Sequence, residues 1–236
     1  MVTAGGVLLV TVLGTVVPLH AIACFRRFRD ASSADPRARE RLFVSTLPLK
    51  YTVAAGATAL FVMEAEKGYG VPLLPPDLVH LAVALPFLGA IALGAVRTRS
   101  LLSSDDGRDQ VTDALQRVAE VIPRTRGERH TWVIAAVSTG LTDELTYRAF
   151  ALSFLAGIFG TRNVVAIGVV SSGLFGLAYL YQGWRGFVLT TMLGAALAVV
   201  AVASGLLTAI VMHVLIDLRL LVIPVGLAEA ADAKRG

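Results

Sequence analysis

Apolar stretches of roughly the length that crosses a lipid bilayer recur along nearly the whole chain. A membrane-spanning helix rises 1.5 Å per residue and needs about 20 mainly apolar residues. The stretches that approach this length are residues 2–24, 42–63, 78–96, 132–160, 163–181, 186–204 and 206–225. We therefore expect an all-α fold, a polytopic membrane helical bundle of about seven transmembrane helices. We interpret the first stretch as a retained span and not a secretory signal, because no basic segment precedes it.

The composition carries far less charge than that of a soluble domain. Only 16% of the 236 residues are charged and the mean hydropathy is +0.72, whereas ordinary soluble domains are about 25% charged. This predicts an integral membrane protein. The net charge of +4 comes from arginines that gather beside apolar stretches, which favours membrane lipids as partners and not nucleic acid. Cys24 is the single cysteine, so an intramolecular disulfide and a cysteine metal cluster are excluded.

The distribution of arginines predicts how the helices are oriented in the membrane. Six arginines lie within residues 25–41 and seven within residues 97–130. Because cytoplasmic segments are enriched in Lys and Arg, both segments should be cytoplasmic. The loop between them, residues 64–77, has Lys67 as its single basic residue and suits the outer face. The amino terminus is then expected outside and the carboxyl terminus in the cytoplasm, and the excess of arginine over lysine favours a bacterial plasma membrane.

The chain divides into four parts. Residues 1–96 form a front part of three spans, and residues 97–130 form a basic cytoplasmic loop. Residues 131–225 form a four-span part that holds the polar site, and residues 226–236 form a cytoplasmic tail. Between residues 108 and 122 of the loop, one helical face is apolar, with Val111, Leu115, Val118, Ala119 and Ile122. This spacing predicts an amphipathic helix, which lies on the inner leaflet or serves as a solvated connector.

Small residues recur within the apolar stretches. Glycine and alanine cluster at residues 89–94, 168–176 and 194–198. Because small side chains let helices approach closely, we interpret these clusters as packing positions.

Ionisable residues lie inside the apolar stretches of the four-span part. They are Asp143, Glu144, Arg148, His213 and Asp217. Each costs at least a few kcal/mol to bury in a bilayer, so such groups are kept mainly where they pair, bind an ion or do chemistry. The sequence therefore predicts a functional site within the membrane.

Helical spacing separates the two acids of the fourth stretch. Glu144 and Arg148 are four residues apart with the acid first, which is the favourable order for an ion pair. Asp143 points about 100° away from Glu144, because 3.6 residues complete a turn, and is left free for another partner. We interpret Glu144 and Arg148 as a buried brace and Asp143 as a functional carboxylate.

His213 and Asp217 share one face of the last stretch at the same spacing. In this geometry both side chains can bind one metal ion, or the acid can orient the imidazole. A lone helical histidine is more often a core residue, but an aspartate beside it at membrane depth favours a site.

Three motifs on separate stretches resemble those of the CPBP intramembrane metalloproteases. They are Asp143-Glu144-xxx-Arg148, Phe175-xxx-Tyr179 and His213-xxx-Asp217. The family contains CAAX prenyl endopeptidases and bacteriocin-processing, Abi-like proteins, and its motifs read Glu-Glu-xxx-Arg, Phe-xxx-His and His-xxx-Asn/Asp. The likeness covers about residues 131–222. It implies a bundle of seven or eight helices around an intramembrane cavity, where an acid and histidines, usually with zinc, activate a water that attacks a peptide carbonyl.

The resemblance also implies roles for individual residues. Asp143 takes the position of the general base, Arg148 that of a bracing arginine, and His213 that of a ligand to metal or water, with Asp217 beside it. The implied catalytic set is Asp143, Glu144, Arg148, Tyr179 and Asp217, and the implied zinc ligands are Asp143, His213 and Asp217.

Two residues depart from the family pattern. Asp143 is one methylene shorter than the family glutamate, which sets its carboxylate back by about 1 Å. Tyr179 replaces the family histidine, and a phenol is a poor zinc ligand and a poor base at neutral pH. His20 and His80 are expected to be interfacial or packing residues, and Lys50 to extend its ammonium toward the cytoplasm.

These observations leave two functions open. The first is a CPBP-like intramembrane metalloendopeptidase that cleaves a membrane-associated peptide or protein, in CAAX-type or bacteriocin-related processing. The alternative is a catalytically impaired pseudoprotease that acts as a membrane binding or scaffolding protein. A proton-coupled transporter is less favoured, because no inverted repeat is present. The oligomeric state is not indicated.

Overall fold

A computed structural model describes residues 3–32, 34–64, 70–115, 121–160 and 163–227 of the chain. These residues form helices joined by short connections, without any strand in the described part. The prediction of an all-α membrane bundle is therefore confirmed. The expectations for Lys67, Arg117, Val118 and Ala119, and for most of the tail, fall outside the described residues.

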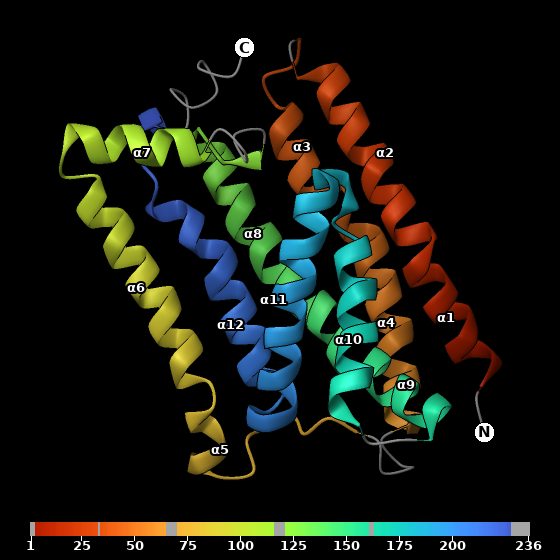
Figure 1. Ribbon diagram of the computed structural model, residues 1–236. Helices are drawn as coiled ribbons and strands as arrows, with labels where there is room; N and C mark the ends of the chain where they lie inside the picture. Colours follow the sequence, from red (N-terminus) through yellow and green to blue (C-terminus); the bar gives the residue numbers. More distant parts are fainter. Residues whose placement is uncertain (1–2, 33, 65–69, 116–120, 161–162, 228–236) are drawn as a thin grey trace.

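The first part of the chain holds the helices α1 to α6. Their bounds are Ala4–Gly14 for α1, Val16–Ala31 for α2, Ala38–Ser45 for α3, Leu47–Glu64 for α4, Leu78–Ala82 for α5 and Leu85–Leu101 for α6. In Figure 1, α1 and α2 stand at one edge of the bundle and α6 at the opposite edge, with α4 between them.

The second part begins with α7, and its described residues include the 3₁₀ turns η4 and η5 and the π-helix η3. The bounds are Asp105–Leu115 for α7, Arg126–Asp143 for α8, Glu144–Ala151 for the π-helix η3, Leu152–Phe159 for α9 and Val164–Leu177 for α10. They continue with Leu180–Gln182 for η4, Gly183–Ser204 for α11, Leu206–Leu218 for α12 and Arg219–Val222 for η5.

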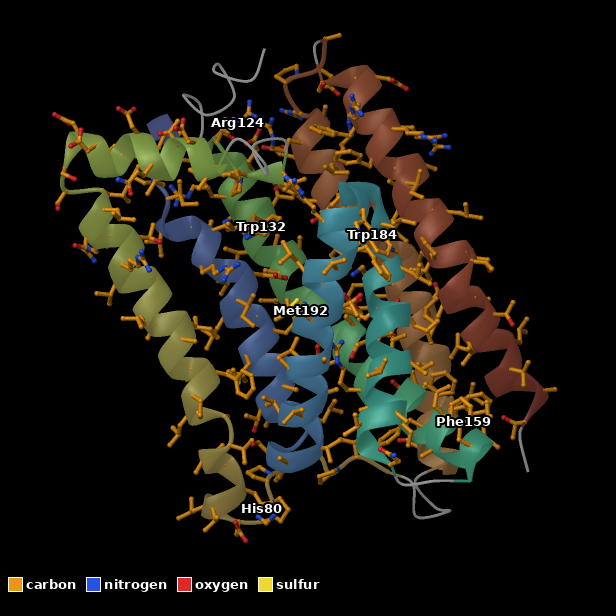
Figure 2. The ribbon with its side chains drawn as sticks, in the orientation of Figure 1. His80, Arg124, Trp132, Phe159, Trp184 and Met192 are labelled. Carbon is orange, nitrogen blue, oxygen red and sulfur yellow. The ribbon has the colours of Figure 1, made fainter. Side chains whose placement is uncertain are left out.

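Four helical segments of the described chain are long and apolar enough to cross a membrane: Ala4–Ala31, Ala38–Met63, Leu78–Leu101 and Leu180–Ser204. The helix Val165–Leu177 is apolar but shorter. Large apolar side chains on the outside of the bundle are exposed as lipid-facing residues would be, and Met192 on α11 (Figure 2) is 65% exposed. The structure thus supports an integral membrane protein, but the predicted count of seven spans is not confirmed.

The two arginine-rich segments lie at the same end of the bundle. Figure 1 shows α7 lying across the end where α2 finishes and where α3 and α8 begin, while α5 lies at the other end. Arg124 and His80 mark these two ends in Figure 2. This placement is the one that the arginine distribution predicts for two segments on one side of a membrane.

The predicted amphipathic helix is observed for its first part, which forms α7, whereas residues 116–120 lie outside the described part and residues 121–122 are not α-helical. The α7 residues Val111 and Leu115 are buried in a cluster with Ile122 and Ile223. The apolar face of α7 therefore packs against the end of the bundle and not against lipid alone. This burial also explains how a short connector helix stays folded, because tertiary packing of an apolar face supplies most helical stability.

Close helix contacts at small residues hold the centre of the bundle together. A Cβ atom at Gly194 of α11 would lie 2.9 Å from Phe175, and one at Gly140 of α8 would lie 2.6 Å from Val214. The packing role predicted for the small residues is confirmed at Gly194. It is wrong at Gly89, Gly94, Gly168 and Gly173, where an added Cβ would meet nothing within 4 Å.

The start of α12, the helix that carries the histidine motif, is fixed by the connection before α5. The amide of Leu206 donates to Pro72 O at 2.8 Å, and that of Leu207 donates to Leu73 O at 3.1 Å. Gly205, at a φ of 89°, makes the turn between α11 and α12 in the left-handed region that favours glycine. These bonds satisfy amides that a helix start leaves without intrahelical partners.

Candidate active site

The helix that carries the first motif changes its winding where the motif begins. α8 starts with a capping box, in which Thr125 Oγ1 accepts from the Glu128 amide while Glu128 caps the amide of Thr125. At Glu144 the α-helix passes into the π-helix η3, which carries both Glu144 and Arg148. π-helical turns inside α-helices are frequent at functional sites, and no proline or glycine in this segment signals one in advance.

Glu144 joins two buried partners at the centre of the bundle. Its Oε1 lies 3.2 Å from Arg148 Nη1 and 2.7 Å from His213 Nδ1. Arg148 also donates from Nη2 to Gly194 O at 3.1 Å and stacks 4.4 Å above the ring of Phe175. The predicted ion pair is therefore confirmed. Glu144 also contacts His213, the histidine that the family resemblance assigns to a metal site with Asp143, so its role is not limited to the ion pair with Arg148.

The contact with Glu144 fixes which nitrogen of His213 carries a proton. A carboxylate only accepts hydrogen bonds, so Nδ1–H is the donor, and in the neutral imidazole the lone pair is then on Nε2. Nε2 lies 3.8 Å from Oδ2 of Asp217. The backbone of Asp217 is fixed in turn by Trp132, labelled in Figure 2. Trp132 Nε1 donates to the backbone carbonyl oxygen of Asp217 at 3.0 Å.

Asp143, which helical phase leaves for a partner other than Arg148, is paired with residues of two other segments. Lys50 Nζ lies 2.8 Å from Oδ1 and 2.7 Å from Oδ2, and the Tyr179 hydroxyl donates to Oδ2 at 2.9 Å. The expectation that Lys50 extends toward the cytoplasm is therefore wrong. Pairing with Asp143 removes much of the cost of burying both charges, which outweighs the gain from reaching the membrane surface.

A cavity of about 340 Å³ adjoins these two clusters. The polar groups on its wall include Lys50, Tyr179, His213 and Asp217, whereas Asp143, Glu144 and Arg148 are not part of the wall. Asp143 therefore lies behind Lys50 and Tyr179, and Glu144 behind His213. The wall includes residues of α3, the first turn of α4, the middle of α8, the last turns of α10 and α12, η4 and η5. These parts place the cavity in the half of the bundle nearer α7 (Figure 1).

The ligands predicted for zinc do not form a metal site in this arrangement. Within the described residues, His, Cys, Asp and Glu side chains form no group of three or more that could hold a metal ion. Both oxygens of Asp143 face the ammonium of Lys50, so a cation already stands where the metal would be expected. The donor set of this chain therefore does not fit the zinc that the family resemblance implies.

The other histidines considered do not complete a metal site. His20 lines the cavity wall, with Cys24 Sγ 3.7 Å from its Nε2. His80 lies at the end of the bundle away from α7 and contacts Asp77 at 2.8 Å. The backbone amide of His80 also donates to Asp77, and this hydrogen bond lowers the pKa of the Asp77 carboxyl. His80 is thus a residue of the helix cap of α5.

The sequence of this chain was compared with protein families, curated proteins and solved structures. Residues 126–219 match the family described as type II CAAX prenyl endopeptidase, Rce1-like. Neither the comparison with curated proteins nor that with solved structures gave a match. The matched segment runs from α8 to the end of α12 and contains the site residues described above except Lys50. The resemblance to the CAAX endopeptidases that the three motifs predicted is therefore confirmed for residues 126–219 of this chain.

Proposed function

We propose that this protein is an intramembrane endopeptidase that hydrolyses a membrane-associated peptide or protein without a bound metal ion. One observation carries the proposal. His213 presents Nε2 to the cavity beside Asp217, while Glu144 holds its Nδ1 at 2.7 Å. An imidazole oriented by a buried carboxylate is a general base of the kind that activates nucleophiles in hydrolases.

The proposed reaction begins with a water held between His213 and Asp217. His213 Nε2 removes a proton from this water as its oxygen attacks the peptide carbonyl carbon, and the carbonyl π electrons move onto the carbonyl oxygen. The intermediate then collapses, the C–N bond breaks, and the proton on Nε2 passes to the leaving amine. The products are an amine and a carboxylic acid, which loses its remaining proton to solvent to become a carboxylate, and His213 returns to its starting state.

Asp217 has two functions in this scheme. Its carboxylate accepts the second proton of the attacking water as a hydrogen bond and so directs the oxygen lone pair toward the carbonyl. At 3.8 Å from Nε2, it also stabilises the positive imidazolium that forms when His213 gains the proton.

The rest of the cavity wall suits an apolar peptide segment. Much of it is apolar, with Val17, Phe43, Leu49, Trp132, Leu193 and Ile216 among its residues. Such a surface favours a substrate whose side chains are themselves drawn from the membrane. CAAX-type and bacteriocin-related peptides both meet this description, and the proposal covers either.

The test is cleavage of membrane-derived peptides by the purified protein in lipid vesicles, with and without a strong chelator. We expect cleavage in both conditions and a fall of about 10²–10⁴-fold in kcat for His213→Gln, the usual contribution of a general base. His80→Gln is the matched control, because His80 lies at the far end of the bundle (Figure 2), and it should leave kcat unchanged. Cleavage that stops with chelator and returns with added zinc would overturn the metal-free proposal.

A second function is favoured by the state of Asp143. The residue in the position of the family base has both oxygens engaged by Lys50 and a further bond from Tyr179. This supports a pseudoprotease that binds its peptide without cleaving it. Tyr179→His separates the two functions, because cleavage that appears only in this variant would assign the parent protein a binding role.

A further inference from the structure

We propose that Lys50 is the resident cation of this cavity and takes the place that a metal ion holds in a metallopeptidase. Its ammonium neutralises Asp143, keeps divalent ions out and presents an N–H group to the substrate. Lys50 lies on α4, outside the segment that matches the endopeptidase family. The cation is therefore a feature that the front part of this chain adds to the matched segment.

The contacts of Lys50 are those of a fixed ion. Its Nζ lies within 2.8 Å of both Asp143 oxygens, 3.5 Å from the Tyr179 hydroxyl and 5.3 Å from the centre of the Tyr179 ring. Its side chain is 15% exposed and that of Asp143 is 5% exposed. Lys50 is thus enclosed by one carboxylate and one aromatic face, both of which favour a positive charge.

This placement excludes a divalent ion from Asp143. A metal ligated by that carboxylate would have to share the position of the ammonium, and two like charges at such short range repel strongly away from bulk water. Displacing Lys50 would leave its ammonium buried without its carboxylate. Lys50 therefore explains, in one contact, why the donor set fails to fit zinc.

The same ammonium is placed to assist the proposed reaction, and this part of the inference rests on the proposed function. Lys50 has three N–H groups. Two donate to Asp143 and the third makes a long contact of 3.5 Å with the Tyr179 hydroxyl. Lys50 lines the cavity together with His213, so this third N–H can exchange the long contact for a hydrogen bond to the substrate carbonyl oxygen as negative charge develops there. Removing one donor of this kind from a hydrolase typically lowers kcat by about 10²–10³-fold.

Metal binding tests the cation role without reference to activity. The experiment compares the purified parent protein with a double variant, Lys50→Met/Tyr179→His, and a triple variant, Lys50→Met/Tyr179→His/Asp143→Asn. Each is checked for its fold by circular dichroism and equilibrated with zinc, and the bound metal is measured by mass spectrometry. We expect no stoichiometric zinc in the parent, about one zinc per chain in the double variant, and loss of that zinc in the triple variant. Stoichiometric zinc in the parent, or none in a folded double variant, overturns the proposal.

Kinetics then test the electrophile role. We compare Lys50→Met/Asp143→Asn, which removes both charges together, with Lys50→Arg, which keeps the cation. We expect the charge-free variant to lose about 10²–10³-fold in kcat with little change in KM, and Lys50→Arg to retain more. Full kcat in the charge-free variant overturns the electrophile role. A parent that cleaves nothing refutes the proposed endopeptidase instead, and zinc binding still decides whether Lys50 is the resident cation.

Discussion

At the scale of single residues, the buried charges form two neighbouring clusters with separate tasks. Arg148, Glu144 and His213 form one cluster around a shared carboxylate oxygen. Lys50, Asp143 and Tyr179 form the other. In each cluster an acid is matched by a base, which is the arrangement that makes ionised groups tolerable at membrane depth.

Glu144→Gln tests whether Glu144 positions His213. An amide can donate to Nδ1 and so favour the tautomer with its proton on Nε2, which cannot accept a proton from water. We expect kcat to fall by about 10²-fold or more, with KM little changed and an altered pH–rate profile, measured per mole of folded protein. An unchanged pH–rate profile would mean that Glu144 does not determine the tautomer of His213.

Arg148→Met tests the ion pair as a structural element. Arg148 is 1% exposed, and its loss leaves Glu144 buried beside His213 alone. Breaking a buried pair typically costs about 3–5 kcal/mol, so we expect a clearly lower midpoint in thermal unfolding. Arg148→Met/Glu144→Gln removes both charges and should recover part of that loss. A double variant that is no more stable than the single one would contradict the pairing.

Sequence reasoning located these residues but paired some of them wrongly. The Glu144–Arg148 contact joins residues four positions apart in the sequence, so helical spacing predicts it. The Lys50–Asp143 and Glu144–His213 contacts join residues 93 and 69 positions apart, and helical phase carries no information at that range. A stricter use of the rule that buried ionisable residues pair with one another would have singled out Lys50.

At the scale of helices, the bundle depends on a few tight crossings that carry the site. Gly194 of α11 lies against Ser172 and Phe175 of α10, and its carbonyl accepts from Arg148. The prediction of packing glycines held here because the residues on α10 and α11 leave no room for a Cβ. It failed for Gly89 and Gly94, since sequence does not tell a helix face that meets protein from one that does not.

Gly194→Ala should therefore destabilise the bundle, whereas Gly168→Ala should not. The added Cβ at residue 194 would lie 2.9 Å from Phe175 and 3.3 Å from the Ser172 backbone, but at Gly168 nothing lies within 4 Å. Overpacking of this kind typically costs about 1–3 kcal/mol. The measurement is thermal unfolding in detergent, and equal midpoints for the two variants would contradict the crossing.

The apolar stretches predicted which parts of the chain are helical but not how each helix is wound. The stretch 206–225 becomes α12 and then the 3₁₀ turn η5, and the stretch 132–160 contains the π-helix η3. The apolar pattern indicates where a helix lies but not whether its winding loosens. That choice depends on contacts with α4, α10 and α12, which have no counterpart in the local sequence.

At the scale of the whole molecule, the position of the cavity sets the side from which a substrate arrives. The cavity lies in the half of the bundle nearer α7, the arginine-rich end. If that end is cytoplasmic, as the arginine distribution predicts, the substrate reaches His213 from the cytoplasmic side of the membrane.

Cysteine labelling of intact cells tests this orientation. In a Cys24→Ser background, Pro76→Cys reports on the end that holds α5, and Ser103→Cys reports on the end that holds α7; both residues are exposed. We expect a membrane-impermeant maleimide to label residue 76 in intact cells and residue 103 only after permeabilisation. The reverse pattern would place the cavity toward the outside.

The Lys50–Asp143 contact also has a consequence for membrane insertion, in which we expect the polar helix to depend on a helix that precedes it. The segments Ala4–Ala31, Ala38–Met63 and Leu78–Leu101 are each long and apolar enough to cross a membrane, and they leave the ribosome before α8. The helix from α8 to α9 brings Asp143, Glu144 and Arg148 into the bilayer and is not among such segments of the described chain. Its entry depends on α4, which already offers Lys50 as a counter-ion, so a chain without that lysine should stall during biogenesis with α8 still outside the lipid.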